Sequence, residues 1–269
     1  MVSNKRIDNN PIAESNRLKN IFSDIKQRPV TDPRFTNVNH SGHTTILPAT
    51  KGDVNDSGNA NFIMPATATT LELVSTSLED GAGTFTGVLA IFIDGLDQNF
   101  NILQEVIALN GTSVVTTTGS YRTINRSIAV AGGIPGSGAV GVITISATTG
   151  GQIFGKYIVD DTSSEVGRYT VPSGYRLLIT ATLYNGGDGG DMTITGELTL
   201  PGAYPISLSD FYVGSQFDNT GGLSFFYLEA GSMFKFRGFT NSGSPATRKL
   251  SAVIIGIQAK IEDWNSIQL

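Results

Sequence analysis

Apolar and polar residues alternate along most of the chain after residue 62, with the period of two that is typical of β-strands. The alternation is clearest in residues 177–183 and 192–200, and a late strand of the same kind covers residues 253–261. The Gly-rich run 185–191 separates the first two strands, which predicts that they form one long hairpin. The pattern predicts an all-β fold, a β-sandwich of the jelly-roll kind.

One short helix is predicted near the start of the chain. Asn10 is suited to cap a helix that Pro11 begins, and Pro29 ends it, which places the helix at about residues 11–27. An i, i+3, i+4, i+7 stripe marks its apolar side: Leu18, Ile21, Phe22 and Ile25. This stripe packs either on its own domain or on another subunit. Polar stretches on both sides favour docking to a partner.

The chain divides into an extended N-terminal arm, residues 1–47, and a β-sandwich body, residues 48–269. Residues 36–60 are rich in Asn, Ser, Gly and Thr and are predicted to form a linker or long loop. Residues 1–35 hold seven Lys or Arg and four Asp or Glu, a net +3, whereas the remainder carries −8. General nucleic-acid binding is not expected of so acidic a body. An acidic protein surface is the partner that suits the arm.

Composition favours a protein that assembles with others. Charged residues make up 15% of the chain, against roughly 25% in an ordinary soluble domain, and there are 32 glycines. Shells and fibres have such compositions because neighbouring subunits cover much of their surface, although a lectin-like module would look similar. The lack of Cys excludes disulfides, thiolate nucleophiles and Cys-ligated zinc. No apolar run approaches the ~18 residues of a transmembrane helix, and no signal peptide is expected.

Two loop motifs resemble known binding sites without completing them. Residues 136–141 match G-x-G-x-x-G, but the residues that follow are predicted to form a strand, whereas a dinucleotide site needs a helix there. Residues 53–58 resemble the start of a calcium loop, but Met64 occupies the position that requires a glutamate. Turns stabilised by Asp and Asn side chains are the simpler interpretation of the second motif.

Catalytic and metal-binding constellations are not predicted. His40 and His43 are the only imidazoles, and one chain cannot complete a tetrahedral zinc site with them. Copies around a symmetry axis could share a metal through these two residues. No G-x-S-x-G elbow occurs, and no pair of carboxylates stands out. No catalytic, cofactor-binding or metal-binding residue is therefore assigned, and the chain is not predicted to be an enzyme.

Aromatic residues concentrate in residues 211–239. Exposed aromatics there would suit stacking on sugar rings, whereas strand-borne Phe is usually core. Residues 225–228 are apolar on both faces of a predicted strand. Such a strand is either enclosed within its own domain or covered by a neighbouring subunit.

Several segments resemble a family of structural proteins from the virions of tailed bacteriophages. The main one is Asn110-Gly-Thr-Ser-Val-Val-Thr-Thr-Thr-Gly-Ser-Tyr-Arg-Thr-Ile-Asn-Arg126, followed by Val142-Ile-Thr-Ile145. Further similar segments are Gly95-Leu-Asp-Gln-Asn-Phe100, Tyr169-Thr-Val-Pro-Ser-Gly174 and Phe226-Tyr-Leu-Glu-Ala-Gly-Ser-Met-Phe-Lys-Phe236. The resemblance covers about residues 90–260, in separate pieces, and does not include the arm.

The resemblance implies a β-sandwich component of a virion, with no catalytic residues to transfer. The expected partners are other copies of the chain, as a homotrimer, and other virion proteins that bind the arm. Tail fibre, neck appendage and capsid decoration all remain open as positions. The alternatives are a carbohydrate- or receptor-binding module of the virion, which would bind a host surface glycan, and a glycan-degrading enzyme. No cofactor and no membrane contact are expected.

Overall fold

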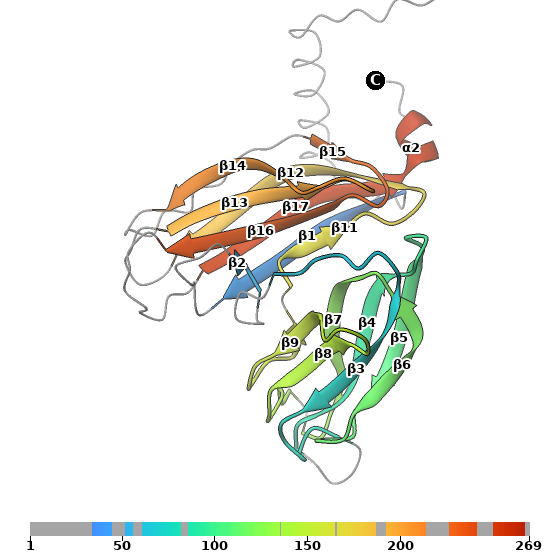
Figure 1. Cartoon of the computed structure of the whole chain (residues 1–269), viewed down its shortest axis with the longest axis vertical. Helices are drawn as coiled ribbons and strands as arrows, with labels where there is room; N and C mark the ends of the chain where they lie inside the picture. The colour runs from blue at the N-terminus through green and yellow to red at the C-terminus, as the bar shows by residue number, and fades with distance from the viewer. Residues whose placement is uncertain are drawn as a thin grey trace, which may run out of the picture.

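The computed structural model describes residues 34–44, 52–55, 61–81, 86–134, 136–164, 166–186, 192–213, 226–240 and 250–266. These residues form two antiparallel β-sandwiches, which lie one above the other in Figure 1. The sequence predicts one sandwich in this part of the chain, and the described residues form two. The arm up to residue 33, with the predicted helix, lies outside the described residues.

Sandwich I consists of strands β3 to β10, in two sheets of order β6-β3-β8-β9 and β10-β7-β4-β5. Its strands are β3 (Thr69–Ser75), β4 (Val88–Leu96), β5 (Ile102–Ala108), β6 (Val115–Tyr121), β7 (Thr123–Gly132), β8 (Ile143–Ala147), β9 (Ile153–Tyr157) and β10 (Ser163–Ser164). Inward residues alternate with outward ones, as Leu71 and Leu73 of β3 show by being fully buried between half-exposed neighbours. The core between the sheets is apolar.

Sandwich II consists of β1 with β11 to β17, in sheets of order β1-β17-β12-β15 and β11-β16-β13-β14. Its strands are β1 (Phe35–Thr44), β11 (Arg168–Thr170), β12 (Tyr175–Gly186), β13 (Met192–Thr199), β14 (Ile206–Val213), β15 (Phe226–Leu228), β16 (Met233–Thr240) and β17 (Leu250–Lys260). The short β2 (Gly52–Asp53) pairs with β16, and the helix α2 (Ile261–Ser266) follows β17.

Both sandwiches have the strand order of a jelly roll. Counted along the chain, the eight strands of sandwich II are arranged as 1-8-3-6 facing 2-7-4-5. Sandwich I gives the same order when counting starts at β9 and β10 and continues from β3 to β8, so it is a circularly permuted jelly roll. The predicted jelly-roll fold is thus confirmed, and it occurs twice.

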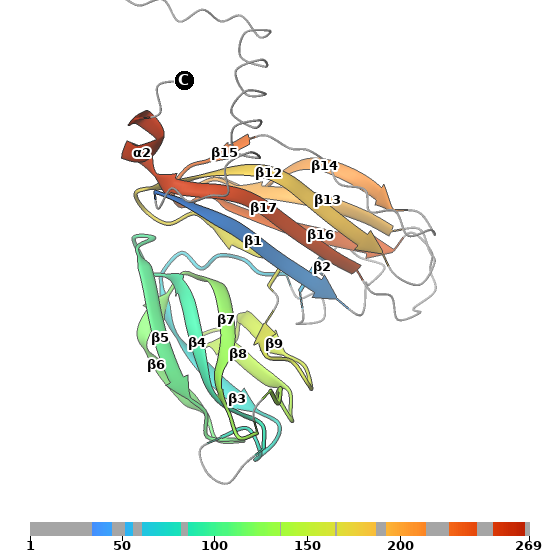
Figure 2. The same cartoon turned by 180° about the vertical axis from the view of Figure 1, so that it is seen from behind.

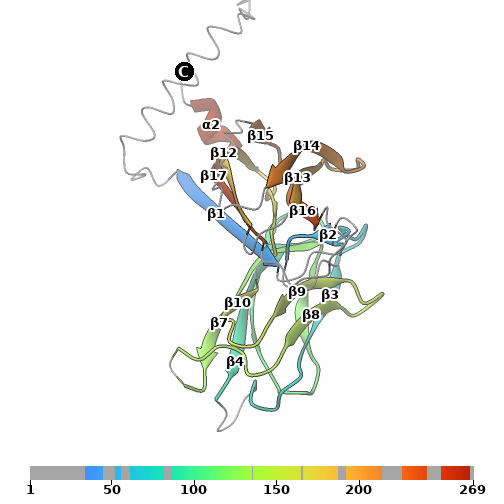
Figure 3. The same cartoon turned by 90° about the vertical axis from the view of Figure 1, so that its left-hand side faces the viewer.

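Sandwich I is inserted between the first and second strands of sandwich II. The chain leaves sandwich II after β2 and returns to it just before β11, and these two crossings lie side by side. Phe236 of β16 joins them, since its backbone oxygen accepts from the amide of Val54 (3.0 Å) and its amide donates to the oxygen of Gly167 (3.1 Å). Figure 3 shows both sandwiches extending from this junction.

Two expectations about individual segments are wrong. Residues 35–44 do not belong to a loop: they form β1, which pairs with β17 along its whole length, from Phe35↔Ala259 to Thr44↔Leu250. The predicted hairpin of residues 177–183 and 192–200 is also not formed, because β12 pairs with β15 and β17 while β13 pairs with β14 and β16. The Gly-rich connection instead joins two facing sheets.

Candidate ligand cavity and interaction surfaces

The four residues predicted to dock onto a partner, Leu18, Ile21, Phe22 and Ile25, lie outside the described residues. The docking helix therefore stays a prediction. The described residues offer three other features to consider: a cavity between the sandwiches, a buried charged cluster at their junction, and an apolar outer sheet face.

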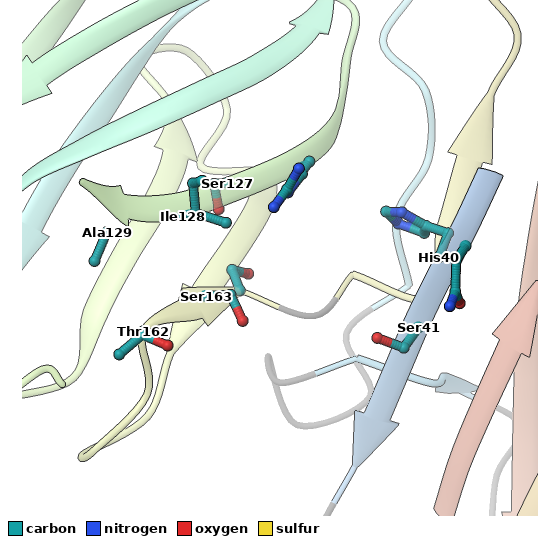
Figure 4. Close-up of a pocket in the computed structure, with 10 residues that line it drawn as sticks. His40, Ser41, Ser127, Ile128, Ala129, Thr162 and Ser163 are labelled. Carbon is teal, nitrogen blue, oxygen red and sulfur yellow. The ribbon is translucent and has the colours of Figure 1, made fainter. Parts of the chain in front are cut away.

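The cavity lies where β1 of sandwich II faces β7 and β10 of sandwich I (Figure 4), and its volume is about 510 Å³. This volume is in the range of small-ligand sites. Its lining residues are Asn39, His40, Ser41, Arg126, Ser127, Ile128, Ala129, Thr162, Ser163 and Ser164. Polar side chains predominate, and none of the lining residues that the structure describes carries a carboxylate.

Arg126 is the permanently charged residue of the cavity lining, and its side chain is exposed. Asp94 on the neighbouring β4 is its register partner and accepts a hydrogen bond from Gln104 Nε2 (3.1 Å). Burial raises the pKa of Asp94, against the opposing effects of the Gln104 hydrogen bond and the positive charge of Arg126.

The two histidines lie on β1 three residues apart, so their side chains point to opposite faces of the strand. His40 packs edge-on against Tyr169, with ring centroids 5.8 Å apart, and it lines the cavity. Among the described residues, no group of three or more His, Asp or Glu could hold a metal ion. The histidines of one chain are therefore not placed to share a ligand.

A buried charged cluster, formed by Asp53, Glu197, Lys235 and Arg237, lies on the outer side of the sheet where β2 pairs with β16. Lys235 Nζ contacts Asp53 (3.1 Å) and Glu197 (3.2 Å), and Arg237 contacts Glu197 (3.0 Å) and Asp53 (3.5 Å). Each carboxylate meets both cations, as low-dielectric surroundings require of a buried charge. Asp53, which begins the calcium-like motif, is thus an ion-pair partner of Lys235.

Phe62 connects this cluster to sandwich I. Its amide donates to Asp53 Oδ2 (2.7 Å), and its carbonyl accepts from Lys235 Nζ (3.0 Å). Its ring packs on Phe154 of β9, with centroids 5.2 Å apart, and lies 3.8 Å from the guanidinium carbon of Arg168. Arg168 also donates to the carbonyl of Phe154. Burial lowers the pKa of Arg168 to about 10, and the negative charge of Asp53 opposes this shift.

The glycine motif at residues 136–141 is a loop at the far end of sandwich I, closed by a buried carboxylate. Asp80 accepts from the amides of Val140 (3.0 Å) and Gly141 (2.8 Å), and also from Val88 N (3.0 Å) and Ser75 Oγ (2.6 Å). These are the amides that a phosphate would need. The strand β8 follows the loop, as the sequence predicts, and the amides are occupied by the protein itself.

The outer side of sheet β10-β7-β4-β5 carries a group of apolar residues that no described element covers completely. This outer apolar face consists of Phe92, Ile102, Val106, Ile128 and Val130. Phe92 of β4 is flanked in register by Val106 of β5 and Ile128 of β7. Val106 is 60% exposed, and Ile102 and Val130 are each 49% exposed. Figure 2, which shows the molecule from behind, presents β5, β4 and β7 side by side on this face. Contiguous exposed apolar groups of this kind mark interaction surfaces.

The late aromatics prove to be mainly structural where they are described. Phe234 and Phe236 are buried in the core of sandwich II. Trp264 of α2 packs edge-on against Phe35 (5.4 Å) and Tyr227 (5.6 Å) of its own chain. Its indole nitrogen donates to the carbonyl of Arg176 (3.1 Å). These rings hold α2 and the start of β1 to sandwich II.

No protein-family model matches the chain, and no curated protein matches it. Among solved structures, it is similar to the infectious bursal disease virus VP2 subviral particle, with 12% identity, a TM-score of 0.24, and coverage of 86% of this chain and 73% of that chain. The Gx strain of the same virus gives 10% identity, a TM-score of 0.24 and coverage of 86% and 74%. The Gt strain gives 11% identity, a TM-score of 0.19, and coverage of 88% of this chain and 74% of that chain. At these TM-scores the fold assignment rests on the strand order alone.

Proposed function

We propose that the chain is a structural protein of a virion, and that it belongs to a tailed bacteriophage. The pair of jelly-roll sandwiches, one inserted into the other, is the observation that supports the proposal most strongly, because jelly rolls are a common fold of virus coat subunits. The segments that resemble phage virion proteins lie in both sandwiches. Tail fibre, neck appendage and capsid decoration are the positions proposed for it.

The part of the arm that precedes β1, residues 1–33, is proposed to attach the subunit to other virion proteins. It precedes β1, the edge strand of its sheet. All ten residues of β1 pair with the inner strand β17. A load on the arm would therefore reach sandwich II through the whole β1/β17 ladder of hydrogen bonds. The proposed contact residues are Leu18, Ile21, Phe22 and Ile25.

Deletion of residues 1–33 tests this attachment. The expected product folds, because β1 remains complete, but it is no longer incorporated into particles. The full-length variant Phe22→Asp is a second test, since it keeps the arm and places a charge on the proposed contact; it is expected to reduce incorporation as well. Incorporation of both variants at wild-type level would contradict the docking role.

The subunit is further proposed to self-associate, as a trimer, through the outer apolar face of sandwich I. A second copy suits this face because the charged side chains that the described residues place on it, Arg126 and Asp94, are register partners and leave it without net charge. Val106→Glu places a carboxylate on the exposed centre of the face and is expected to yield monomers in light scattering. Leu78→Glu, at a 65% exposed residue away from the face, is the matched control. An unchanged mass for Val106→Glu would exclude this surface.

A carbohydrate- or receptor-binding role is the second candidate, and the polar cavity between the sandwiches favours it. No catalytic activity is part of the proposal. Release of sugars from a capsular polysaccharide by the purified protein would replace both candidates with a glycan-degrading enzyme.

A further inference from the structure

We propose that the cavity between the sandwiches binds one unit of an acidic saccharide, with Arg126 holding the carboxylate. The inference adds a ligand site to the virion role proposed above. It deepens the carbohydrate-binding candidate above and rests on it for the class of ligand. Arg126 and Ile128 also lie on the outer apolar face, so a bound saccharide and the proposed trimer contact would compete for them, and a failed titration would leave the virion role untouched.

The charge of the cavity favours an anion. Arg126 lines it, His40 is the other basic side chain among the described lining residues, and none of these described residues is acidic, although the whole chain carries −5. Arg126 forms no ion pair with any of the described residues, and its nearest anionic neighbour in the sheet, Asp94, does not line the cavity. A guanidinium that forms no ion pair within the protein can bind a ligand carboxylate through two parallel hydrogen bonds from its planar fork of N–H donors.

The remaining lining favours a polyhydroxylated ligand over a simple anion. Asn39 and Ser41 on one wall, and Thr162 and Ser163 on the other, make no side-chain hydrogen bond to a described residue. Figure 4 shows Ser41 on β1 across the cavity from Ser163. Hydroxyls and amides both donate and accept, which matches the hydroxyl groups around a sugar ring. An inorganic ion would use the guanidinium and leave these groups to water.

The walls are fixed relative to each other, so the site is preorganised. Asn125, next to Arg126 on β7, is bonded through its side chain to the backbone of Thr170 in sandwich II, at 2.8 and 2.9 Å. The hydrogen bonds of Phe62 with Asp53 and Lys235 of the buried charged cluster also fix the junction. Groups on strands held in this way lose little entropy when a ligand binds.

Binding is tested by NMR titration of the ¹⁵N-labelled full chain with methyl β-glucuronide and, as the neutral match, methyl β-glucoside. The expected result is saturable shifts of the amides of residues 126–129 and 162–164 with the glucuronide, at a Kd of roughly 1 mM for a ligand of this size. The glucoside is expected to bind at least about tenfold more weakly, because it lacks the carboxylate.

Two variants separate charge from hydroxyl recognition. Arg126→Gln is expected to weaken glucuronide binding about tenfold, while Lys260→Gln, a neutralisation at an exposed residue elsewhere, leaves it unchanged. Ser41→Val removes a hydroxyl from the opposite wall and is expected to weaken both glycosides. Arg126 is exposed, so unfolding temperatures should stay at the wild-type value. Equal affinity for the two glycosides, no saturation, or wild-type affinity of Arg126→Gln would each overturn the proposal.

Discussion

The side-chain amide of Asn125 forms two hydrogen bonds with the backbone of Thr170, so that a residue of sandwich I pairs with a strand of sandwich II. Asn125 Nδ2 donates to the Thr170 oxygen (2.8 Å), and the Thr170 amide donates to Asn125 Oδ1 (2.9 Å). This reciprocal pair has the pattern of a strand ladder. Both residues are buried, so the pair fixes the relative position of the two sandwiches in a place that water does not reach.

Asn125→Ala is expected to destabilise the protein by about 2–4 kcal/mol, because it leaves the buried amide and carbonyl of Thr170 without partners. Urea unfolding measures the change. Asn99→Ala, at an exposed turn residue, is the control and should remain within about 0.5 kcal/mol of wild type. A loss below about 1 kcal/mol for Asn125→Ala would show that the pair is dispensable.

Lys235→Met tests the buried charged cluster. The side chain fits a similar volume but leaves Asp53 and Glu197 with Arg237 as their shared cation, so a loss of about 3–5 kcal/mol is expected. Lys260→Met, on an exposed side chain, is its control. If both variants unfold at the same denaturant concentration, the cluster contributes no stability.

Gly167→Ala tests the close approach of the two chain crossings. Gly167 has a φ of +55°, and a Cβ built there would lie 2.0 Å from the carbonyl oxygen of Val54. A loss of at least about 2 kcal/mol is expected from backbone strain and this collision. Gly150→Ala isolates the strain, since Gly150 has a φ of +79° and nothing within 4 Å of its Cβ position. Equal losses for the two variants would argue against the collision.

Stability is expected to fall as the pH rises above about 10, the ordinary tyrosine pKa. Burial raises the pKa of Tyr121, Tyr157 and Tyr169, so the folded chain keeps three protons that the unfolded chain releases. The folded state then binds more protons, and the free energy of unfolding declines with pH. Arg168 acts in the opposite direction, because its pKa is lowered to about 10, but it is one group against three.

The pH effect is measured by urea unfolding at about pH 8 and about pH 11, on either side of the ordinary tyrosine pKa. Tyr157→Phe is expected to reduce the decline, because it removes one of the three buried hydroxyls. Tyr204→Phe, at a side chain that is 91% exposed, should leave it unchanged. A decline that is identical in both variants would attribute it to other groups.

The strands could be predicted from the sequence more reliably than their partners. The period of two in β12 and β13 identifies each strand, but it does not specify which sheet a strand joins, so the predicted hairpin was wrong. β1 was not predicted, because its inward positions include Gly42 and Thr44. A segment with so few large apolar side chains has the sequence pattern of a loop. The outer apolar face had a signal, since Ile102 and Val106 lie on the same side of one strand.

The contacts at the junction and the cavity beside it could not be predicted, because the residues that form them are distant in sequence. Lys235 and Asp53 are 182 residues apart, and Asn125 and Thr170 are 45 apart. The walls of the cavity come from β1, β7 and β10, so no local motif describes it. His40 was singled out by residue type, but the residues that accompany it became visible only when the insertion of sandwich I was known.

The adjacency of Val54 and Gly167 has an evolutionary consequence. Because the chain leaves and re-enters sandwich II at one point, all strands of sandwich II can pair as they do whatever the length of the inserted segment. In the permuted order of sandwich I, the first strand is β3 and the last is β10, and both of its ends connect to that point. Relatives could therefore exchange, enlarge or lose sandwich I while they keep sandwich II, so this position suits evolutionary diversification.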